Sequence, residues 1–433
     1  MTSDSGCGSP AASSATGEPM STRAWIVVAL LVVSVVINYV DRSDLSIAAP
    51  VMQKQFALTP VQLGSLLAAF FWTYALLQIF GISGWLADRF SAGWVILCGY
   101  VLWTLATVAT GLTAGFVALF ALRLLLGVGE SVAYPCYSRI FALMPQQYRG
   151  RANAFIDAGT KLGPAAGAFA GGMLLVHFGW RMLFVVLGLG GLLWVLPWWK
   201  VMPRTEAAAP PEQAAPAASL LRLIRLRSAW GTFLGHFCGN YFFYFLLAWL
   251  PEFLVREEHL SISAMSRLTT AVFLLIALST LVAGWTSDRL IARGVSPTRV
   301  RKAVVVGGLS LASLLLATEV VPRSHAAVSL ALLAVACVGY GAFTSNHWAI
   351  TQTLAGPAMT GRWSGLQNGF ANFSGIAAPW VAGWITQVNG SARLAFVVAG
   401  GVALAGALCW GLLVARVEPV AWSVGSDIPE AIQ

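Results

Sequence analysis

Uninterrupted apolar runs dominate the pattern of hydrophobic and polar positions along the chain. Each run is about 20 residues long, which is the length that lets an α-helix cross the hydrocarbon core of a bilayer. Short polar segments with Gly, Pro, Ser or charged residues separate the runs. The pattern predicts twelve membrane-spanning helices, at residues 24–48, 60–83, 93–112, 115–141, 151–176, 181–200, 229–254, 264–287, 302–320, 325–353, 363–387 and 393–416.

The composition supports this interpretation. Hydrophobic residues make up 58% of the chain, charged residues only 10%, and the mean hydropathy is +0.75, all outside the range of soluble domains. Backbone polar groups in lipid must be paired within the segment, so spanning segments are helical. The sequence lacks the alternating ten-residue strands of a membrane barrel. We therefore predict an all-α integral membrane protein that contacts the lipid bilayer.

The placement of Lys and Arg predicts the orientation, because short cytoplasmic loops are enriched in them. With the N-terminus inside, 17 of the 26 basic residues lie on the cytoplasmic side. The outer side receives Lys54, Arg181, Arg256, Arg267, Arg323 and Arg393. The three basic residues predicted within the membrane are Arg42, Arg123 and Lys161. A multi-pass protein of the cell membrane with both termini cytoplasmic follows, and this bias explains the net charge of +9 without a nucleic-acid partner.

Composition shifts divide the chain into five parts. The first residues are rich in Ser, Ala and Gly without the pattern of a signal peptide, and Met20 is a possible alternative start. An Ala- and Pro-rich loop separates the first six predicted helices from the last six. The predicted parts are a disordered cytoplasmic tail at 1–22, a six-helix bundle at 23–200, a cytoplasmic linker at 201–228, a second six-helix bundle at 229–417 and a cytoplasmic tail at 418–433.

Three short sequences recur in the same order in the two halves. GWLADR at 84–89 returns as GWTSDR at 284–289, and RMLFVVLG at 181–188 returns as RLAFVVAG at 393–400. GRANAF, which starts at residue 150, has its counterpart in GRWSGL, which starts at residue 361. These repeats predict two pseudo-symmetric six-helix bundles. Parallel repeats of this kind are a transporter architecture, with the substrate site near the midplane between the bundles.

With these motifs, the chain resembles the major facilitator superfamily over almost its whole length. Its signature loop is matched in part by Gly84, Asp88 and Arg89, and again by Gly284, Asp288 and Arg289. The resemblance implies that these loops take part in gating. Each Asp would meet a helix start in the opposite bundle, Asp88 near Gly361 and Asp288 near Gly150; a solvated loop turn is the alternative.

Within that superfamily, three segments look like the anion:cation symporter family. They are NYVDRSDLSIAAP in the first helix, WTYALLQ in the second and RLLLGVGESVAYP in the fourth. That family includes carriers of galactonate, glucarate, hexuronates and phthalate. The resemblance therefore implies a small organic anion as the substrate.

Ionisable residues within the predicted spans are the candidates for function, since such residues are costly in lipid and face the bundle interior. Arg42 offers a planar fork that can bind a carboxylate through two hydrogen bonds. Its neighbour Asp41 points about 100° around the helix, so the two need not pair with each other. Asp41 can then carry a proton. A lock between helix ends is the alternative role for this pair.

Glu130 in the fourth helix is the second candidate proton carrier. Arg123 precedes it by seven residues, close to two turns, so both face the same way. The resemblance implies that Asp41 and Glu130 occupy the proton-linked positions, with Arg123 as their switching partner. A purely structural pair of Arg123 with Glu130 is the alternative.

The remaining expected substrate contacts follow from the family pattern. The resemblance places Arg42, Tyr39 and Tyr74 along the substrate pocket, together with an amide at Asn372. Among other polar residues of the second half, Tyr244 and Asn368 are further candidates for binding substrate hydroxyls, or for hydrogen bonds between helices.

Lys161 adds a second cation near the middle of the membrane. Asp157 lies one helical turn before it, an arrangement that favours an intrahelical pair. The sequence leaves open whether Lys161 binds substrate or neutralises Asp157. In the same predicted helix, small residues recur every four positions and indicate close helix packing, at Gly159, Gly163, Gly167 and Gly171.

Together these features favour a proton-coupled symporter that takes up a small organic anion, expected to be a monomer. A proton-linked exporter of the same superfamily is the alternative, although Arg42 and Lys161 argue against its apolar pocket. The six cysteines are scattered and no GxxxxGK[ST] loop occurs. The sequence therefore predicts neither an enzyme nor a metal or cofactor site.

Overall fold

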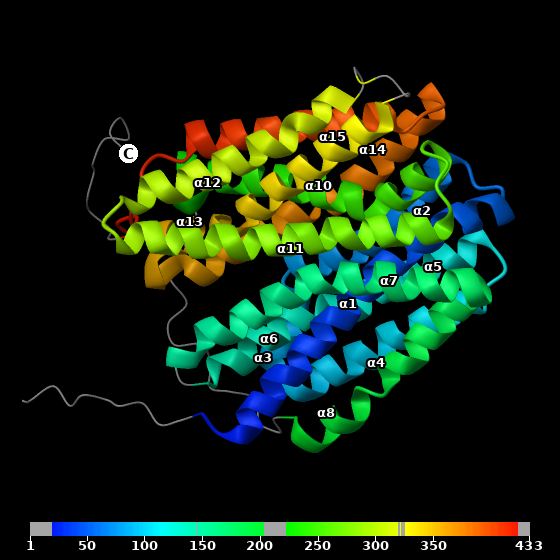
Figure 1. Ribbon diagram of the computed structural model, residues 1–433. Helices are drawn as coiled ribbons and strands as arrows, with labels where there is room; N and C mark the ends of the chain where they lie inside the picture. Colours follow the sequence, from blue (N-terminus) through cyan, green and yellow to red (C-terminus); the bar gives the residue numbers. More distant parts are fainter. Residues whose placement is uncertain (1–19, 145, 203–221, 319–320, 322–324, 423–433) are drawn as a thin grey trace, which may run out of the picture.

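The first half of the chain folds into one bundle of helices. The computed structural model describes residues 20–144, 146–202, 222–318, 321 and 325–422 (Figure 1). The helices of the first bundle are α1 (Thr22–Gln55), α2 (Pro60–Ile79), α3 (Ile82–Arg89), α4 (Ala92–Gly111), α5 (Phe116–Ser131), α6 (Ala133–Ala142), α7 (Gln146–Leu192) and α8 (Val195–Val201).

The second half forms a matching bundle. Its elements are α10 (Arg227–Arg256), α11 (Ile262–Ala292), α12 (Pro297–Ala312), η1 (Ser313–Thr318), α13 (Ala326–Asn372), α14 (Ser374–Asn389), α15 (Arg393–Leu408) and η3 (Cys409–Leu413). The described part of the chain contains no strand. The predicted tails and linker lie largely outside the described residues. Residues 418–422 of the predicted last tail pack on the second bundle, where Val420 donates its backbone N–H to the Leu354 carbonyl at 2.9 Å.

The same helix crossing occurs in both bundles. A Cβ on Gly99 of α4 would lie 2.6 Å from the Gly129 carbonyl oxygen, and one on Gly129 would lie 2.8 Å from the Gly99 oxygen. Gly308 of α12 and Gly339 of α13 approach each other in the same reciprocal way. Only residues without a side chain allow backbones to come this close. The predicted duplication of the halves is therefore confirmed.

Ten helical segments among the described residues are long and apolar enough to span a membrane. One of them, Arg151–Val201, contains 51 residues, and Gly179 with φ 79° and ψ 170° divides it into two spans. Gly356, with φ 60°, ends the tenth predicted span in the same way. The eleventh is divided between the end of α13 and α14 at Phe373. The division at Gly179 turns the ten segments into eleven spans, and the span formed by the end of α13 and by α14, which is not among the ten, completes the twelve that were predicted.

The fourth span breaks at Val132, between α5 and α6 and two residues after Glu130. Pro135 has no backbone N–H and its ring would clash with the carbonyl of Ser131, four residues earlier. The released Ser131 carbonyl instead accepts a hydrogen bond from Gln78 Nε2 of α2 at 3.4 Å. Glu130 therefore lies at the last regular turn of α5, facing the interior.

The two bundles touch at one end of the molecule. We call the end that holds Thr22 the proximal end and the end that holds Gln55 the distal end. At the distal end α2 packs against α14. A Cβ on Gly64 would lie 2.5 Å from a carbonyl oxygen of α14, and one on Gly383 would lie 2.5 Å from the Pro60 carbonyl oxygen of α2. Small residues thus close the distal end.

A second distal contact joins α7 and α11, which run side by side in Figure 1. Ser266 of α11 donates a hydrogen bond to the Ala168 carbonyl at 2.6 Å. At the proximal end, by contrast, the described residues leave open space within 4 Å of a Cβ built on Gly84 or Gly361. The bundles are therefore closed at the distal end and separate toward the proximal end.

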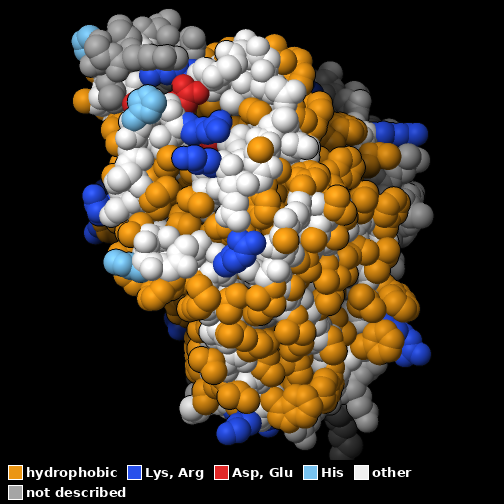
Figure 2. All heavy atoms as spheres, turned by 90° about the vertical axis from the view of Figure 1, so that its right-hand side faces the viewer, with side chains coloured by type: hydrophobic (Ala, Val, Ile, Leu, Met, Phe, Trp, Pro, Cys, Tyr) orange, Lys and Arg blue, Asp and Glu red, His pale blue; other side chains and the backbone are white. Residues whose placement is uncertain are grey.

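The outer surface is apolar, as expected for contact with lipid. Many large hydrophobic side chains are exposed along the helices, among them Phe80, Trp85, Val117, Phe178 and Leu281. Figure 2 looks onto the distal end, where hydrophobic side chains cover much of the lower part of the view and several Lys, Arg and His side chains lie toward its top. Of the six basic residues predicted for the outer side, five lie at the distal end; Arg323 lies outside the described residues. The distal end therefore holds the described basic residues that the sequence assigns to the outer side.

Candidate functional site

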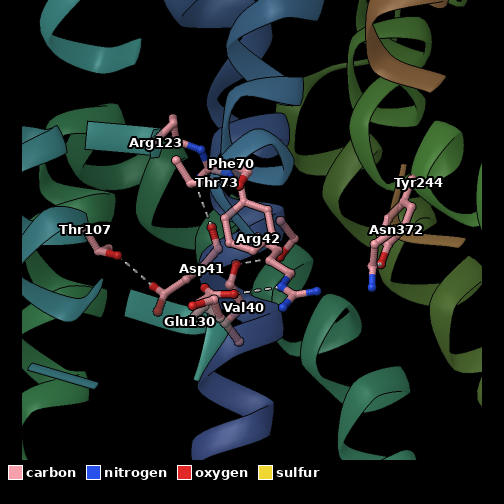
Figure 3. A network of polar contacts seen from close by, with 12 residues as sticks. Val40, Asp41, Arg42, Phe70, Thr73, Thr107, Arg123, Glu130, Tyr244 and Asn372 are labelled. Atoms are coloured by element: carbon pink, nitrogen blue, oxygen red, sulfur yellow. Dashed lines mark hydrogen bonds and ion pairs between the residues drawn. The ribbon is translucent and has the colours of Figure 1, made fainter. Parts of the chain in front are cut away.

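Two consecutive residues of α1 point into different parts of the first bundle. Asp41 extends toward α4, whereas the Arg42 guanidinium lies on the side that faces the second bundle (Figure 3). Both residues are buried. The separation follows from the helix itself, because successive side chains are about 100° apart around its axis. The predicted independence of the two side chains is observed.

Arg42 is held by one acid and three aromatic rings. Its Nε lies 2.8 Å from Glu130 Oε2, and the two side chains are 2% and 0% exposed. The guanidinium carbon lies 4.6 Å from the ring centre of Tyr39 and 4.7 Å from those of Phe70 and Tyr74. These contacts place the cation against electron-rich ring faces. They hold a full positive charge in the middle of the bundle.

The other side of the guanidinium points toward the second bundle. Figure 3 shows its terminal nitrogens directed toward Asn372 and Tyr244. The Tyr244 hydroxyl donates a hydrogen bond to Asn372 Oδ1 at 3.0 Å, and Asn372 Nδ2 donates to the Asn368 carbonyl at 3.0 Å. Asn368 Nδ2 in turn lies 3.5 Å from Gln78 Oε1 of α2. Polar groups from both bundles thus converge on the region beside Arg42.

Asp41 forms a separate part of the site. Its Oδ1 accepts a hydrogen bond from the Thr107 hydroxyl of α4 at 3.2 Å. Arg123 of α5 donates from Nη1 to the backbone carbonyl of Asp41, also at 3.2 Å, and not to its carboxylate. The Arg123 guanidinium also lies 5.9 Å from the Phe70 ring centre. Arg123 therefore lies between the two acids without a direct hydrogen bond to either carboxylate.

Each of the four charged residues retains one buried polar atom that has no hydrogen-bond partner within the described structure. These atoms are Asp41 Oδ2, Arg42 Nη2, Arg123 Nε and Glu130 Oε1. A buried polar atom without a partner is costly, so each is a place where a proton or a ligand oxygen would be favourable. The arrangement can therefore hold an anion at Arg42 and protons at the two acids.

The structure thus brings together most of the predicted site residues. Asp41, Arg42, Tyr39, Tyr74, Arg123 and Glu130 form one cluster in the first bundle, and Asn372 faces it. The suggested pair of Arg123 with Glu130 is not observed, because Arg42 takes the Glu130 carboxylate. Sequence spacing favours partners on the same helix, whereas the observed pair joins Arg42 to Glu130, 88 positions later in the chain.

Lys161 is engaged by its own helix. Its ammonium lies 3.0 Å from Asp157 Oδ1 and donates to the Thr160 hydroxyl at 2.9 Å. The structure thus contains the intrahelical pair that the spacing favoured. The Asp157 side chain is 49% exposed, so this pair is partly solvated and weak. A substrate contact for Lys161 stays a prediction.

The two gating loops do not reach the opposite bundle in this conformation. Asp88 lies 3.8 Å from Arg139 of its own bundle and its side chain is 60% exposed. Asp288 is exposed as well. The expected contact of Asp88 near Gly361 is not formed, because the bundles separate at the proximal end. The neighbouring Arg289 lies over Trp285, with its guanidinium carbon 4.5 Å from the ring centre.

Two contributors to the site were missed in the sequence. Phe70 lies under both Arg42 and Arg123, and Thr107 hydrogen-bonds Asp41. Nothing in the sequence separates Phe70 from other aromatic residues of the apolar runs. Thr107 lies in the middle of an apolar span, and that position is a weak signal for a buried hydroxyl with a polar partner.

Two six-helix bundles, the first of which holds a cluster of buried acids and arginines facing polar groups of the second, define a membrane transporter with a central site. The family model of the Major Facilitator Superfamily matches residues 31–379. The chain belongs to this superfamily, among its anion transporters. It is accordingly a multi-pass membrane transporter and not an enzyme.

Curated relatives extend over nearly the whole chain. The chain is 29% identical to the D-galactonate transporter of Escherichia coli O6:H1 over 426 residues, which cover 92% of the chain and 97% of the relative. It is 30% identical to the hexuronate transporter of Bacillus subtilis over 396 residues, covering 87% and 92%. It is also 30% identical to the probable galactarate/D-glucarate transporter GarP of Escherichia coli K12, covering 92% and 96%.

Solved structures show the same fold at lower identity. A bacterial homologue of the human lysosomal transporter Spinster, in an inward-facing and unoccupied conformation, superposes with a TM-score of 0.77 and 19% identity, covering 92% of this chain and 98% of that one. The D-xylose-proton symporter superposes with a TM-score of 0.72 and 17% identity, covering 92% and 99%.

Proposed function

We propose that the protein is a proton-coupled symporter that imports a small organic anion, such as a sugar acid, across the cell membrane. The observation that carries this proposal is the buried pair of Arg42 with Glu130. Among the described residues, Arg42 Nη2 has no hydrogen-bond partner, and the guanidinium lies on the side that faces the second bundle. A carboxylate bound there would receive hydrogen bonds from a planar cation that cannot lose its charge. The names of the relatives support a sugar acid as the substrate class.

Competition for Arg42 gives a physical route to coupling. In this conformation Glu130 occupies one edge of the guanidinium. Protonation of Glu130 removes its negative charge and leaves the full charge of Arg42 to the substrate carboxylate. Deprotonation restores the internal pair and expels the anion. Proton and substrate therefore bind together and leave together.

Asp41 is the second proposed proton site. Thr107 hydrogen-bonds one carboxylate oxygen and the other is free to carry a proton. Arg123 is close enough to act electrostatically on both Asp41 and Glu130. In the proposed cycle it compensates whichever acid is ionised.

We further propose that the proximal end is cytoplasmic. The distal end carries few basic residues, in line with the positive-inside rule. The conformation described above is then open to the cytoplasm and closed to the outside, as expected after substrate release. Opening requires separation of the contacts around Gly64 and Ser266. The gating loops at Asp88 and Asp288 would approach the opposite bundle when the proximal end closes.

Transport into proteoliposomes tests the proposal directly. Purified protein is reconstituted and given radiolabelled D-galactonate, D-glucuronate or D-glucarate with an inward proton gradient. We expect accumulation of at least one of them above the outside concentration only while the gradient exists. Glu130→Gln should exchange substrate but not accumulate it, because Gln mimics a permanently protonated acid. Accumulation that depends on sodium alone, or proton-driven export from loaded vesicles, would contradict the proposal.

A further inference from the structure

A third carboxylate lies buried in the first bundle and has no part in the function proposed above. Asp44 of α1 is 0% exposed, and within the described structure neither of its carboxylate oxygens has a hydrogen-bond partner. It follows Asp41 by three residues, so the two acids lie on neighbouring parts of one helix face. An ionised carboxylate without hydrogen bonds is among the most costly groups to bury in a membrane protein.

The surroundings of Asp44 do not compensate its charge. The charged groups that act on it are Asp41, which repels it, and Arg123, which attracts it. α7 presents Gly171, and a Cβ built there would lie 3.6 Å from Asp44 Oδ1. None of the other ionisable groups on the helices packed on α1 hydrogen-bonds Asp44 in the described structure. They are Tyr148, Arg149, Arg151, Asp157, Lys161, His177 and Arg181 on α7, Arg227, His236, Cys238, Tyr241, Tyr244, Glu252 and Arg256 on α10, Tyr74 on α2, and Lys200 on α8.

The cluster holds one more acid than it holds cations. Asp41, Asp44 and Glu130 are three acids, and they share two cations, Arg42 and Arg123. Arg42 is engaged by Glu130, so Arg123 would have to neutralise both Asp41 and Asp44. Its contact with α1 is to a backbone carbonyl. One excess negative charge would therefore be buried if all three acids were ionised.

We propose that Asp44 is a third proton-binding site, which takes up a proton before the distal end closes and releases it later in the transport cycle. This inference rests on the proposed function for its place in the cycle. The geometry links the site to closure: Gly171 faces Asp44, and the next residue, Gly172, is in contact with Ser266 of the opposite bundle. In the proposed cycle, closing this contact moves the segment of α7 that covers Asp44, and a buried carboxyl group is far less costly when it is neutral.

Infrared spectroscopy of the reconstituted protein tests the site without any substrate. Difference spectra between acidic and alkaline buffer reveal the carbonyl stretch of carboxyl groups that gain a proton. We expect Asp44→Asn to remove one component of this band and Asp44→Glu to shift it. Glu418→Gln, which removes an exposed carboxylate after the last helix, is the matched surface control and should leave the buried component intact. A spectrum unchanged by Asp44→Asn would overturn the proposal.

The bound ion is identified in the same preparation. Spectra at fixed acidic pH are recorded in sodium chloride and in choline chloride, since a buried pair of acids is also a conceivable sodium ligand. A proton site gives the same band in both salts. A component that disappears in sodium for the wild type and is absent in Asp44→Asn would assign the site to sodium and overturn the proton.

Transport measurements then decide whether the Asp44 proton is moved. Uptake of whichever of D-galactonate, D-glucuronate or D-glucarate the wild type accumulates is followed to its limit at a gradient of one pH unit with the membrane potential held at zero. One coupled proton fewer lowers the limiting accumulation about tenfold, so Asp44→Asn should show this loss. An unchanged limit in Asp44→Asn would overturn transport of this proton. A wild type that shows the infrared component but no proton-driven uptake would refute the symport function while leaving the proton site standing.

Discussion

Replacing Glu130 by Gln tests the competition between substrate and internal acid. Glu130 Oε2 lies 2.8 Å from Arg42 Nε in a pair with almost no solvent exposure. Gln has nearly the same volume and keeps one acceptor oxygen, but it has no charge. The variant therefore presents Arg42 to the substrate at any pH, whereas the wild type must first protonate Glu130.

The expected size of the pH effect on substrate affinity follows from the linkage between substrate binding and proton binding. Where Glu130 is ionised in the free protein, binding of one substrate requires uptake of one proton, so the apparent Kd rises about tenfold for each pH unit. This corresponds to about 1.4 kcal/mol per unit. In Glu130→Gln the slope of log Kd against pH should fall by one. Any remaining slope would belong to the other acids of the cluster.

Titration calorimetry with the organic acid that most raises the thermal stability of the protein measures this slope. Glu252→Gln is the matched control, because Glu252 is also a buried Glu beside an Arg, with Arg256 Nε at 2.9 Å, but lies at the distal end of α10. Its slope should equal that of the wild type. An unchanged slope in Glu130→Gln would refute the competition between substrate and Glu130 for Arg42.

Three further changes probe other contacts. Arg42→Lys keeps the charge but loses the planar fork, so calorimetry should show binding at least about tenfold weaker; equal affinity would place the anion elsewhere. Lys161→Met combined with Asp157→Asn should recover uptake that either change loses if Lys161 serves only Asp157, and continued loss would support a substrate contact. In Gly64→Val the new Cβ would lie 2.5 Å from a carbonyl oxygen of α14, so the variant should prevent distal closure and raise amide hydrogen exchange in α14. Gly307→Val is the control, because a Cβ there meets open space. Equal hydrogen exchange in the two variants would contradict this closure.

Most of the fold was readable from the sequence because lipid imposes a simple rule. Apolar runs of spanning length must be helices, and their ends are close to those observed. The predicted helix at 60–83 differs in detail, since α2 ends at Ile79 and Gly81, with φ 70°, separates it from α3. The break after Phe373 was not predicted either. Such interruptions depend on single backbone angles that hydropathy does not encode.

The site was predictable in its members but not in its pairing. Charged residues within apolar runs are rare enough that Asp41, Arg42, Arg123 and Glu130 could be selected by position alone. The partner of Glu130 depends on how α1 packs against α5, and no local spacing reports that packing. Asp44 lay inside the same motif, three residues after Asp41. Its significance depends on its missing partners, which only the structure reveals.

The glycine series in α7 connects packing with function. It was predicted to serve close helix contact, and each Gly faces α1 at matching steps of four residues. The facing pairs are Gly159 with Val35, Gly163 with Tyr39, and Gly167 with Ser43. This seam fixes the rotation of α1, so Arg42 must face the second bundle and Asp41 must face α4. At the next step of four, Gly171 lies beside Ile47 and also beside Asp44, and as a glycine it offers the Asp44 carboxylate no polar side chain. The seam that orients the anion receptor therefore also isolates the third acid, and a proton is the smallest ligand that can neutralise it there.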